Sequence, residues 1–524
     1  MSGPTELLAP ATCRAEVLRE RYRRAGFWSG DPADAIRFTA KRYPDRAALQ
    51  HRTRTLSYAE LDALVDLAGH ALVEAGATSG SPVVIVAGND VDSVVAIHAA
   101  LRVDAVVLLV ARSAGIAAVQ DVLTRSGARH VIGRSGDPFV ADLPDDCTFV
   151  AVPAAGAMAV RADPLRSTRA ADEPSFVLYT SGTTSRPKGV VHSISTLTKA
   201  SINYIAAAGL GAHDSIFLIS PLASVTGVLQ ALFIGPMLAI PVVLEDRWDP
   251  AATCDFLLDS GATWYGGPDR LLDRLLDEVV AREKVVPLRA VYLGGTQLDR
   301  RIVERVEADF GIVVMRAYGS SEVPISTSGV RTEPSELRHA DDGAPLADVE
   351  VRVGSTMEPT ECCIRGPHTF LGYTDADDDA QAFDGEWFRT GDVADLDDGR
   401  VRIVGRIKDI VIRNGLKIPA AEVDEAVLRI RGVRECAAYS VADETTGERL
   451  AVALVLDEGA DLTLAELSSA LVTAGLPKYK LPEELVFWEQ SLPLNANGKV
   501  ERNKLAERSV GLHRVVADRV RAAH

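Results

Sequence analysis

Up to about residue 317, short apolar runs of strand length alternate with stretches whose apolar residues recur at helical spacing. The runs that we expect to form buried strands are Pro82–Val86, Ala105–Val110, Arg129–Ile132, Ser175–Tyr179, Ser215–Ile219, Pro241–Leu244, Ala262–Tyr265, Arg289–Leu293 and Val313–Ala317. The helices expected around them are Leu56–Val73 with Ser57 as N-cap, Asp90–Ala100, Gly115–Thr124, Thr226–Ile234, Ala251–Asp259, Pro268–Val280 and Asp299–Asp309. Strands that alternate with helices in this way indicate a parallel sheet covered on both faces.

The pattern changes near Gly343. Strands whose residues alternate or nearly alternate follow, with Gly and Asp between them, which predicts an antiparallel, β-rich region: Val349–Val353, Cys362–Arg365 and Arg400–Val404. Gly405–Asp409 is a junction, and beyond it the order strand, helix, strand, strand, helix predicts a compact α+β unit of domain size. Its expected elements include the helices Ala420–Leu428 and Leu464–Ala474 and the strands Glu435–Val441 and Leu450–Leu456, and a short basic helix is expected at Leu512–His524.

Composition limits the class of protein. A chain of 524 residues exceeds one ordinary core, so two or more domains are expected, and 47% hydrophobic with 25% charged residues is typical of a soluble globular protein. The net charge of −17 argues against a nucleic-acid partner. The six cysteines are scattered without C-x-x-C spacing, which favours free thiols in a reducing, cytoplasmic compartment.

Neither the N-terminal residues nor the long uncharged run predicts a membrane segment. The first 24 residues carry Glu6, Glu16 and Glu20 and no long apolar run, unlike a signal peptide. Ser215–Leu244 is uncharged and long enough to span a bilayer, but its three prolines would break such a helix repeatedly. Buried strands and a core helix explain this run better, so we expect no membrane span.

One loop suggests phosphate binding. The apolar run Ser175–Tyr179 leads into small and hydroxylated residues, followed by Lys188 and Gly189; the loop residues are Thr180, Ser181, Gly182, Thr183 and Thr184. A glycine that permits close approach, hydroxyl and amide donors and one cation are suited to phosphate oxygens. This is not the common P-loop, because Pro187 precedes the Lys and a Gly follows it. The simpler alternative is a flexible linker between two strands.

Further candidates follow other predicted strands, where sites of open parallel sheets lie. In Ala317–Glu322, Tyr318 offers a flat face for a nucleobase, Ser321 a hydroxyl for phosphate and Glu322 an oxygen ligand for Mg²⁺. Leu293–Thr296 contains Gly294 and Gly295, which permit close approach of a ring. Asp392 offers a carboxylate to ribose hydroxyls, and Lys499 lies in a loop near the end of the chain. Each signal alone is weak, since a solvated turn would look the same.

Together these residues resemble the adenylate-forming superfamily of acyl-CoA synthetases, luciferases and peptide-synthetase adenylation domains. The resemblance runs from about Leu56 to Leu505 and rests on motifs in order: Tyr179–Gly189, Tyr318–Glu322, Trp387–Asp392, Gly405–Asp409 and Asn497–Lys499. The motifs are most similar to those of bacterial acyl- or aryl-CoA ligases. The resemblance implies an α/β fold with a large N-terminal domain, residues 1–406, of doubly wound sheets and a β-rich subdomain. It also implies a small, mobile α+β lid domain, residues 407–524, that rotates about Lys408.

The resemblance also implies ATP, Mg²⁺ and coenzyme A as cofactors and a role for each motif. Lys499, Glu322 and Lys188 would be catalytic, with Glu322 the metal ligand and Gly415 in a loop on the thiol side. The residues implied in ATP or AMP binding are Thr180, Ser181, Gly182, Thr183, Thr184, Lys188, Gly294, Gly295, Thr296, Tyr318, Gly319, Ser320, Ser321, Asp392 and Arg406.

Two departures from the family pattern bear on the acid substrate. The family places an aromatic residue and a His after a Pro-Leu pair, where this chain has Ala223 and Ser224, and a proline-rich turn after Val110 is missing. The first departure allows an unusual carboxylic acid, or a small inorganic acid such as nitrite activated for transfer to an amine in secondary metabolism. The candidate pocket residues are Ala223, Ser224, Thr226, Gly227, Tyr265, Gly266, Val323 and Pro324.

The sequence therefore predicts an AMP-forming ligase that passes an acyl group to coenzyme A. Transfer to an amine or to a carrier-protein thiol, and a non-catalytic nucleotide-binding homologue, are the alternatives. The intact Lys188, Glu322, Asp392 and Lys499 argue against the non-catalytic alternative. A monomer and a homodimer are equally compatible with the sequence.

Overall fold

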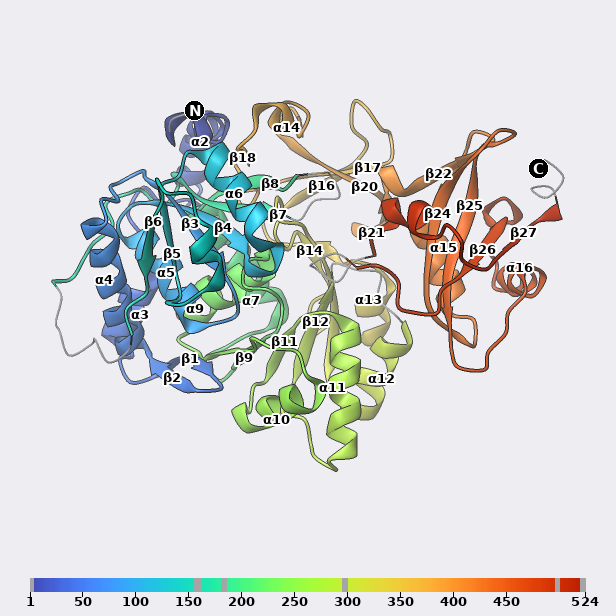
Figure 1. Ribbon diagram of the computed structural model, residues 1–524, viewed down its shortest axis with the longest axis horizontal. Helices are drawn as coiled ribbons and strands as arrows, with labels where there is room; N and C mark the ends of the chain where they lie inside the picture. Colours follow the sequence, from blue (N-terminus) through green and yellow to red (C-terminus); the bar gives the residue numbers. More distant parts are fainter. Residues whose placement is uncertain (1–3, 155–162, 181–185, 295–299, 495–499, 519–524) are drawn as a thin grey trace. The chain divides into compact units, whose positions relative to one another are not determined.

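The computed structural model describes residues 4–154, 163–180, 186–294, 300–494 and 500–518 (Figure 1). The chain divides into two compact units. One comprises Met1–Gly295, Arg300–Val351 and Ile364–Phe388, and the other the remaining residues, so that most of it is Arg389–His524.

A mostly parallel sheet in the first unit confirms the predicted alternation. Its strand order is β18-β8-β7-β4-β3-β5-β6. The bounds are β3 Pro82–Ala87, β4 Val106–Ala111, β5 His130–Gly133, β6 Thr148–Ala151, β7 Pro174–Thr180, β8 Lys188–Ser193 and β18 Gly372–Tyr373. Every residue of β3 is buried, which explains its uninterrupted apolar run, because both faces of this sheet are covered. Strand β8 is antiparallel to both β7 and β18.

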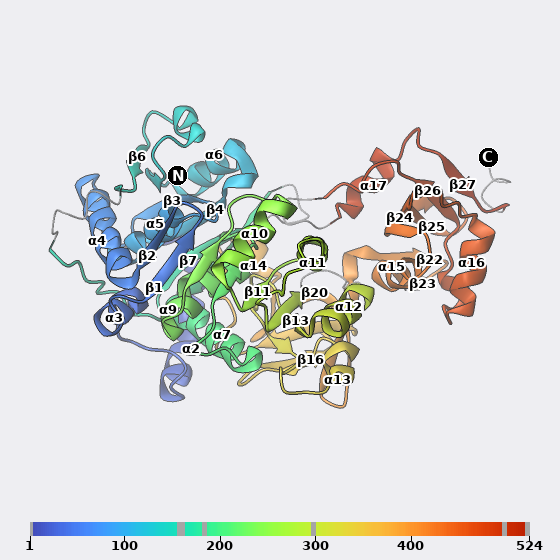
Figure 2. The same cartoon turned by 90° about the horizontal axis from the view of Figure 1, so that it is seen from below.

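Helices cover this sheet, and local caps explain where they begin. Helices α5 and α6 both pack against β3 and β4 (Figures 1 and 2). The predicted cap of α4 is confirmed as a reciprocal pair, since the Ser57 side chain accepts from the Glu60 N–H and the Glu60 carboxylate from the Ser57 N–H. The bounds are α1 Pro4–Leu7, α2 Ala9–Arg24, α3 Ala35–Arg42, α4 Tyr58–Glu74, α5 Val91–Arg102, α6 Gly115–Ser126 and the 3₁₀ turns Arg112–Ala114 and Pro138–Asp142.

A second sheet in the first unit has the order β15-β14-β13-β12-β11-β9-β10-β1-β2. Its strands are β1 Ala47–His51, β2 Arg54–Ser57, β9 Ile216–Leu218, β10 Val242–Leu244, β11 Trp264–Gly266, β12 Ala290–Gly294, β13 Val313–Tyr318, β14 Thr327–Ser328 and β15 Ala344–Pro345. The adjacent helices are α7 Ile194–Ala208, α10 Pro250–Ser260, α11 Asp269–Ala281, α12 Arg300–Phe310 and α13 Ser335–Ala340. Helix α11 packs beside α10 and α12 (Figure 1).

The uncharged run Ser215–Leu244 forms buried strands and core helices, as predicted. The helix expected at Thr226–Ile234 is interrupted, because α8 Val225–Val228 continues into a π-helical segment, η4 Leu229–Ile234, and then α9 Gly235–Leu238. π-Helical turns inside helices are frequent at functional sites. In the described part of the chain, no helix is long and apolar enough to cross a membrane.

The β-rich region is confirmed as largely antiparallel. Its strands follow the order β16-β17-β20-β19, with β21 paired to β20. The bounds are β16 Glu350–Val353, β17 Glu361–Arg365, β19 Phe383–Asp384, β20 Trp387–Asp397, β21 Arg400–Arg406 and helix α14 Ala376–Ala380.

The C-terminal part of the second unit is the predicted α+β fold. Its sheet has the order β23-β22-β25-β26-β27, with β24 paired to β25, and a core that includes Val423, Leu454 and Leu467. The bounds are β22 Ile410–Arg413, β23 Leu416–Pro419, β24 Val433–Asp443, β25 Gly447–Leu456, β26 Glu484–Phe487, β27 Arg514–Val516, α15 Ala420–Leu428, α16 Leu464–Thr473, α17 Arg502–Arg508 and the 3₁₀ turns Ile407–Asp409 and Lys478–Lys480.

The basic helix predicted at Leu512–His524 is wrong for residues 512–517. Arg514–Val516 form strand β27, antiparallel to β26, so that Leu485 pairs with Val515. Backbone pairing at the sheet edge outweighs the weak helical preference of this short basic stretch.

Candidate nucleotide and acid site

The predicted phosphate loop connects two antiparallel strands. Tyr179 pairs with Gly189 and Thr180 with Lys188 across the end of the β7–β8 hairpin. A side chain at Gly189 would force Thr374 to move, because its Cβ would lie 2.4 Å from Oγ1 of Thr374. The predicted phosphate ligands Ser181, Gly182, Thr183 and Thr184 lie outside the described residues. The hairpin therefore fixes the two ends of the loop.

Lys188, the predicted loop cation, is paired with a carboxylate of helix α14. Its Nζ lies 3.0 Å from Oδ1 of Asp378 and 4.9 Å from the ring centroid of Tyr373. The neighbouring Arg186 pairs with Asp375 at 2.5 Å. Asp375 also caps α14 by accepting from the Asp377 N–H. The basic end of the hairpin thus meets carboxylates on and just before α14.

The predicted adenine loop follows β13 and is tightly folded. Tyr318, the last residue of β13, is half-buried. Gly319 is required there, because a Cβ would lie 2.4 Å from the Ile325 nitrogen. The Ser320 hydroxyl accepts from the N–H groups of Glu322 and Val323 at 3.3 and 3.4 Å.

A buried histidine anchors the same loop to β8. Nε2 of His192 donates to the Ser321 carbonyl at 2.7 Å. Burial lowers the pKa of His192 to about 4, so the ring is neutral at physiological pH and donates through one nitrogen. The Glu322 carbonyl in turn accepts from the Phe370 N–H at 2.7 Å. The loop is therefore held in place through its backbone carbonyls.

Glu322, the predicted metal ligand, is oriented by Tyr373. The phenol donates to Oε1 of Glu322 at 2.7 Å. Burial, together with the charge of Glu322, raises the pKa of Tyr373, so the phenol retains the proton that it donates. Among the described residues, no three His, Cys, Asp or Glu side chains cluster to hold a metal. A single oriented carboxylate fits Mg²⁺, which proteins commonly hold through one or two carboxylates together with substrate phosphates.

The first residues of the predicted acid pocket, Ala223 and Ser224 in the turn before α8 and Thr226 within α8, are partly buried. The Ser224 hydroxyl is the N-cap of α8: it accepts from the Gly227 N–H at 3.1 Å and donates to the Pro221 carbonyl at 2.7 Å. Gly227 has a packing role, because a Cβ would lie 2.2 Å from the Pro221 carbonyl oxygen. Ser224 thus has a local structural role in addition to its predicted place beside the acid.

The other predicted pocket residues lie deeper. Val323 and Pro324 are buried, and the buried Tyr265 donates its hydroxyl to the Pro268 carbonyl at 2.9 Å. At Gly266 a Cβ would lie 1.9 Å from Nε2 of Gln230. The fully buried Gln230, which the sequence did not indicate, lies in the π-helical segment and is 2.8 Å from the Tyr204 hydroxyl.

The second unit holds the predicted ribose, hinge and thiol-side residues. Asp392 is buried, and Arg406, opposite it in the β20–β21 register, places Nε 3.3 Å from Oδ1 of Asp392. Lys408 is exposed in the 3₁₀ turn after β21, and Gly415 has a φ of +78° in the tight turn between β22 and β23. The turn requires this conformation, which glycine adopts readily.

Gly294 ends β12, opposite Ala317 in β13. Gly295, Thr296 and Lys499 lie outside the described residues.

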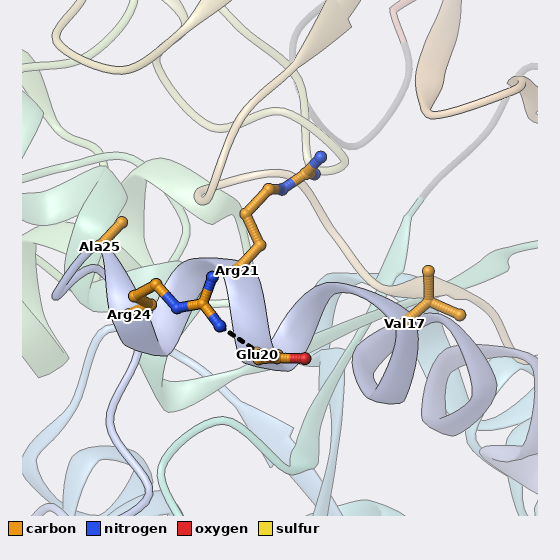
Figure 3. Close-up of a pocket in the computed structure, with 5 residues that line it drawn as sticks. All are labelled: Val17, Glu20, Arg21, Arg24 and Ala25. Atoms are coloured by element: carbon orange, nitrogen blue, oxygen red, sulfur yellow. Dashed lines mark hydrogen bonds and ion pairs between the residues drawn. The ribbon is translucent and has the colours of Figure 1, made fainter.

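A surface hollow of about 420 Å³ lies elsewhere, along α2 (Figure 3). Val17, Glu20, Arg21, Arg24 and Ala25 line it. Its charged residues are paired, Arg24 with Glu20 and Arg21 with Glu386. None of the predicted site residues lines this hollow.

Two residues at the nucleotide side escaped sequence reasoning. Tyr373 and Asp378 follow no predicted strand end, and Tyr373 is 51 residues from its partner Glu322. The run of aspartates at Asp375 and Asp377–Asp379 was a visible signal. An acidic run alone gives no indication that it lies against a phosphate loop.

Comparison with known proteins identifies the family. The model of the AMP-binding enzyme family matches residues 36–374, and that of the AMP-binding enzyme C-terminal domain matches residues 422–499. An oxalate–CoA ligase of Arabidopsis thaliana is 29% identical over 89% of this chain and 96% of its own. A salicyl-AMP ligase / salicyl-S-ArCP synthetase of Mycobacterium tuberculosis is 29% identical, with 94% and 93% covered.

Among solved structures, o-succinylbenzoate coenzyme A synthetase from Bacillus subtilis, in complex with ATP and magnesium ion, has the same fold. Its TM-score is 0.80 at 23% identity, with 90% of this chain and 99% of that chain covered.

The chain belongs to the AMP-binding enzyme family, the adenylate-forming enzymes that the motifs indicated. It is an AMP-forming ligase.

Proposed function

We propose that the protein joins a carboxylic acid to coenzyme A at the expense of ATP, through an enzyme-bound acyl-adenylate. The observation that carries this proposal is the grouping of Lys188 at the start of β8, Tyr373 of β18 and Glu322 in the loop after β13. A cation at a phosphate hairpin beside an oriented carboxylate is the arrangement that a nucleotide triphosphate with Mg²⁺ requires.

The chemistry has two steps. A carboxylate oxygen attacks the α-phosphorus of ATP, and the bond to the β,γ-pyrophosphate breaks, which leaves the acyl-adenylate. The thiolate of coenzyme A then attacks the acyl carbon, and AMP leaves with the electrons of the acyl–oxygen bond. Since two anions meet in the first step, positive charge must be concentrated at the site. Mg²⁺ supplies part of that charge when bound.

The chain's own residues divide the nucleotide between them in this proposal. Thr180, Lys188 and the loop Ser181–Thr184 bind the β- and γ-phosphates, and Glu322 binds the metal. Tyr318 stacks on adenine, which Gly294, Gly295 and Thr296 line. Ser320 and Ser321 contribute to nucleotide binding by holding the loop after β13 in its fold. Asp392 accepts both ribose hydroxyls with the support of Arg406, 3.3 Å away.

The small domain, residues 407–524 in this proposal, serves the two steps in turn. Lys499 neutralises charge during adenylation. Rotation about Lys408 then withdraws it and brings the turn with Gly415 to the thiol side. A hinge at a short 3₁₀ turn that is exposed to solvent is the kind of position that can absorb such a change.

The acid in this proposal is a carboxylic acid. Ala223 and Ser224 remove two rings from the pocket of Thr226, Gly227, Tyr265, Gly266, Val323 and Pro324, while Gln230 adds a buried polar group. The M. tuberculosis relative is named for a carrier protein, so transfer to a carrier thiol is the second candidate. Nitrite activation has no specific observation in its favour. Six free cysteines are compatible with the cytoplasmic location that we propose.

The test is a pyrophosphate-release screen across acids, with coenzyme A, a carrier protein or an amine as acceptor. We expect release with a carboxylic acid and a thioester product with coenzyme A. Lys499→Ala should abolish adenylation and leave thioester formation from supplied acyl-adenylate largely intact. Release with nitrite alone, or a Lys499→Ala enzyme that adenylates at the wild-type rate, would contradict the proposal.

A further inference from the structure

The cations of the phosphate hairpin are paired with carboxylates. Lys188 pairs with Asp378, and Arg186 with Asp375. All four residues are partly exposed: the side chains of Lys188 and Asp378 retain 30% and 20% of their accessible surface. Asp378 and Asp375 therefore contact the positive charges that the β- and γ-phosphates would contact.

Tyr373 links this pair to the metal carboxylate. Its ring lies 4.9 Å from Nζ of Lys188, and its hydroxyl donates to Glu322 at 2.7 Å. The backbone N–H of Tyr373 donates to Asp379 at 3.0 Å, which connects β18 to α14. One side chain thus contacts both the loop cation and the carboxylate.

We propose that Asp378 is an exchangeable counter-ion that ATP displaces from Lys188, and that Tyr373 is the positioning residue that keeps Lys188 and Glu322 in place through the exchange. This inference rests on the proposed function, because it assigns the displacing anion as the β,γ-phosphates of ATP.

Energetics favour exchange. A partly exposed Lys–carboxylate pair contributes little, since solvent screens it and both partners lose side-chain entropy. The polyphosphate carries more charge than one carboxylate and offers several acceptor oxygens, so it competes effectively for the ammonium group. The aromatic ring attracts the cation in both states and depends little on which anion is present. The hydroxyl of Tyr373 donates to the Glu322 carboxylate whichever anion pairs with Lys188.

The first experiment measures direct binding of the non-cleavable analogue α,β-methylene-ATP with Mg²⁺ by calorimetry, in the full-length protein without acid. Asp378→Asn removes the competing charge, so we expect the dissociation constant to fall about two- to fivefold. Asp377→Asn is the matched control: it removes the same charge one residue away, from an exposed side chain of α14. We expect it to change the dissociation constant less than Asp378→Asn does.

Weaker binding by Asp378→Asn would overturn the exchange, because Asp378 would then support Lys188 in the bound state. Equal effects of the two variants would reduce the contact to general charge repulsion and would also overturn it. Failure of the wild-type protein to bind the analogue would count against the proposed function itself, which separates the two failures.

The second experiment tests Tyr373 by titrating Mg²⁺ at a fixed concentration of analogue. Tyr373→Phe keeps the ring below Lys188 and loses only the hydroxyl, so the Mg²⁺ concentration for half-maximal binding should rise about three- to tenfold. Binding at saturating Mg²⁺ should stay within about twofold of the wild type.

Tyr373→Leu removes the ring as well, and it should weaken binding even at saturating Mg²⁺. An unchanged Mg²⁺ dependence of Tyr373→Phe would overturn the positioning role. Circular dichroism melting curves identify a variant that fails to fold, and the comparison of Asp378→Asn with Asp377→Asn then still decides the exchange.

Discussion

Two groups of ion pairs in the first unit differ in the burial of the cation and in the number of its partners. Arg102 of α5 is almost fully buried, with 1% of its side chain exposed, and donates to Asp34, Asp62 and Asp66 at 2.7–3.2 Å. Lys188, at the end of the phosphate hairpin, is 30% exposed and pairs with one carboxylate. We expect the first group to stay paired, whereas our proposal has the second exchange its carboxylate for phosphate.

The difference between the two groups follows from how deeply their charged side chains are buried. A buried guanidinium is stable only if all its donors are satisfied, so the partners of Arg102 cannot leave. A half-exposed ammonium costs little to unpair, so phosphate can replace Asp378. Burial thus separates structural from functional charge here, although both kinds involve the same residue types.

The largest effect should come from breaking the fixed group. Arg102→Met removes the buried guanidinium that pairs with Asp34 and leaves Asp62 and Asp66 with Arg37 as their cation, and we expect the free energy of unfolding to fall by about 3–5 kcal/mol. Urea unfolding followed by circular dichroism measures it. Arg186→Met, at an exposed pair, is the matched control and should cost less than about 1 kcal/mol. Equal losses would remove the distinction between the two groups.

Next is the loss of the oriented carboxylate. Glu322→Gln keeps the shape but offers a neutral amide to a hard cation, so adenylation should fall by about 100-fold. Pyrophosphate release at varied Mg²⁺ concentration measures it. Glu336→Gln, in the exposed first turn of α13, removes one negative charge elsewhere and should leave the rate unchanged. Wild-type Mg²⁺ dependence in Glu322→Gln would show that another group holds the metal.

Two buried histidines should make the free energy of unfolding depend on pH. Burial lowers the pKa of His192 to about 4 and that of His368 to about 3, against 6.5 for an ordinary histidine. Between pH 6.5 and 4 the unfolded chain therefore binds protons that the folded chain excludes, and folding stability falls as pH falls. Each ring contributes a slope approaching about 1.4 kcal/mol per pH unit.

Unfolding free energies from urea titrations at pH 7, 6 and 5 measure this slope. His368→Asn removes one of the titrating rings and should flatten it. A stability that stays level down to pH 5 would mean that neither ring is kept neutral by burial.

The smallest effect concerns Ser224, where local structure and substrate recognition meet. Ser224→Ala removes the N-cap of α8 and should lower stability by about 1 kcal/mol, whereas Ser224→Asp should keep it. Ser224→His tests the substrate role through the specificity constant on the best acid of the screen. If that variant matches or exceeds the wild type, the departure from the family pattern does not mark unusual substrate chemistry.

Prediction from the sequence succeeded where the signal is local. The run Pro82–Ala87 is wholly apolar because the strand is buried on both faces, and the cap at Ser57 lies within one turn of its partner. It failed where distant pairing decides the outcome. β1 lies beside β10, whose residues are far along the chain, and β27 forms because β26 offers a sheet edge.

By itself the sequence determined the order of strands and helices, the family and the residue types at the ends of β7, β12 and β13, because periodicity and short motifs are properties of neighbouring residues. Only the tertiary structure decided that Tyr373 lies between Lys188 and Glu322, and that Asp378 pairs with the loop cation. The antiparallel pairing of β18 with β8 brings Tyr373 near Lys188, although the two residues are far apart in the sequence. No periodicity in the chain encodes a contact of that length, since it depends on how whole strands pack.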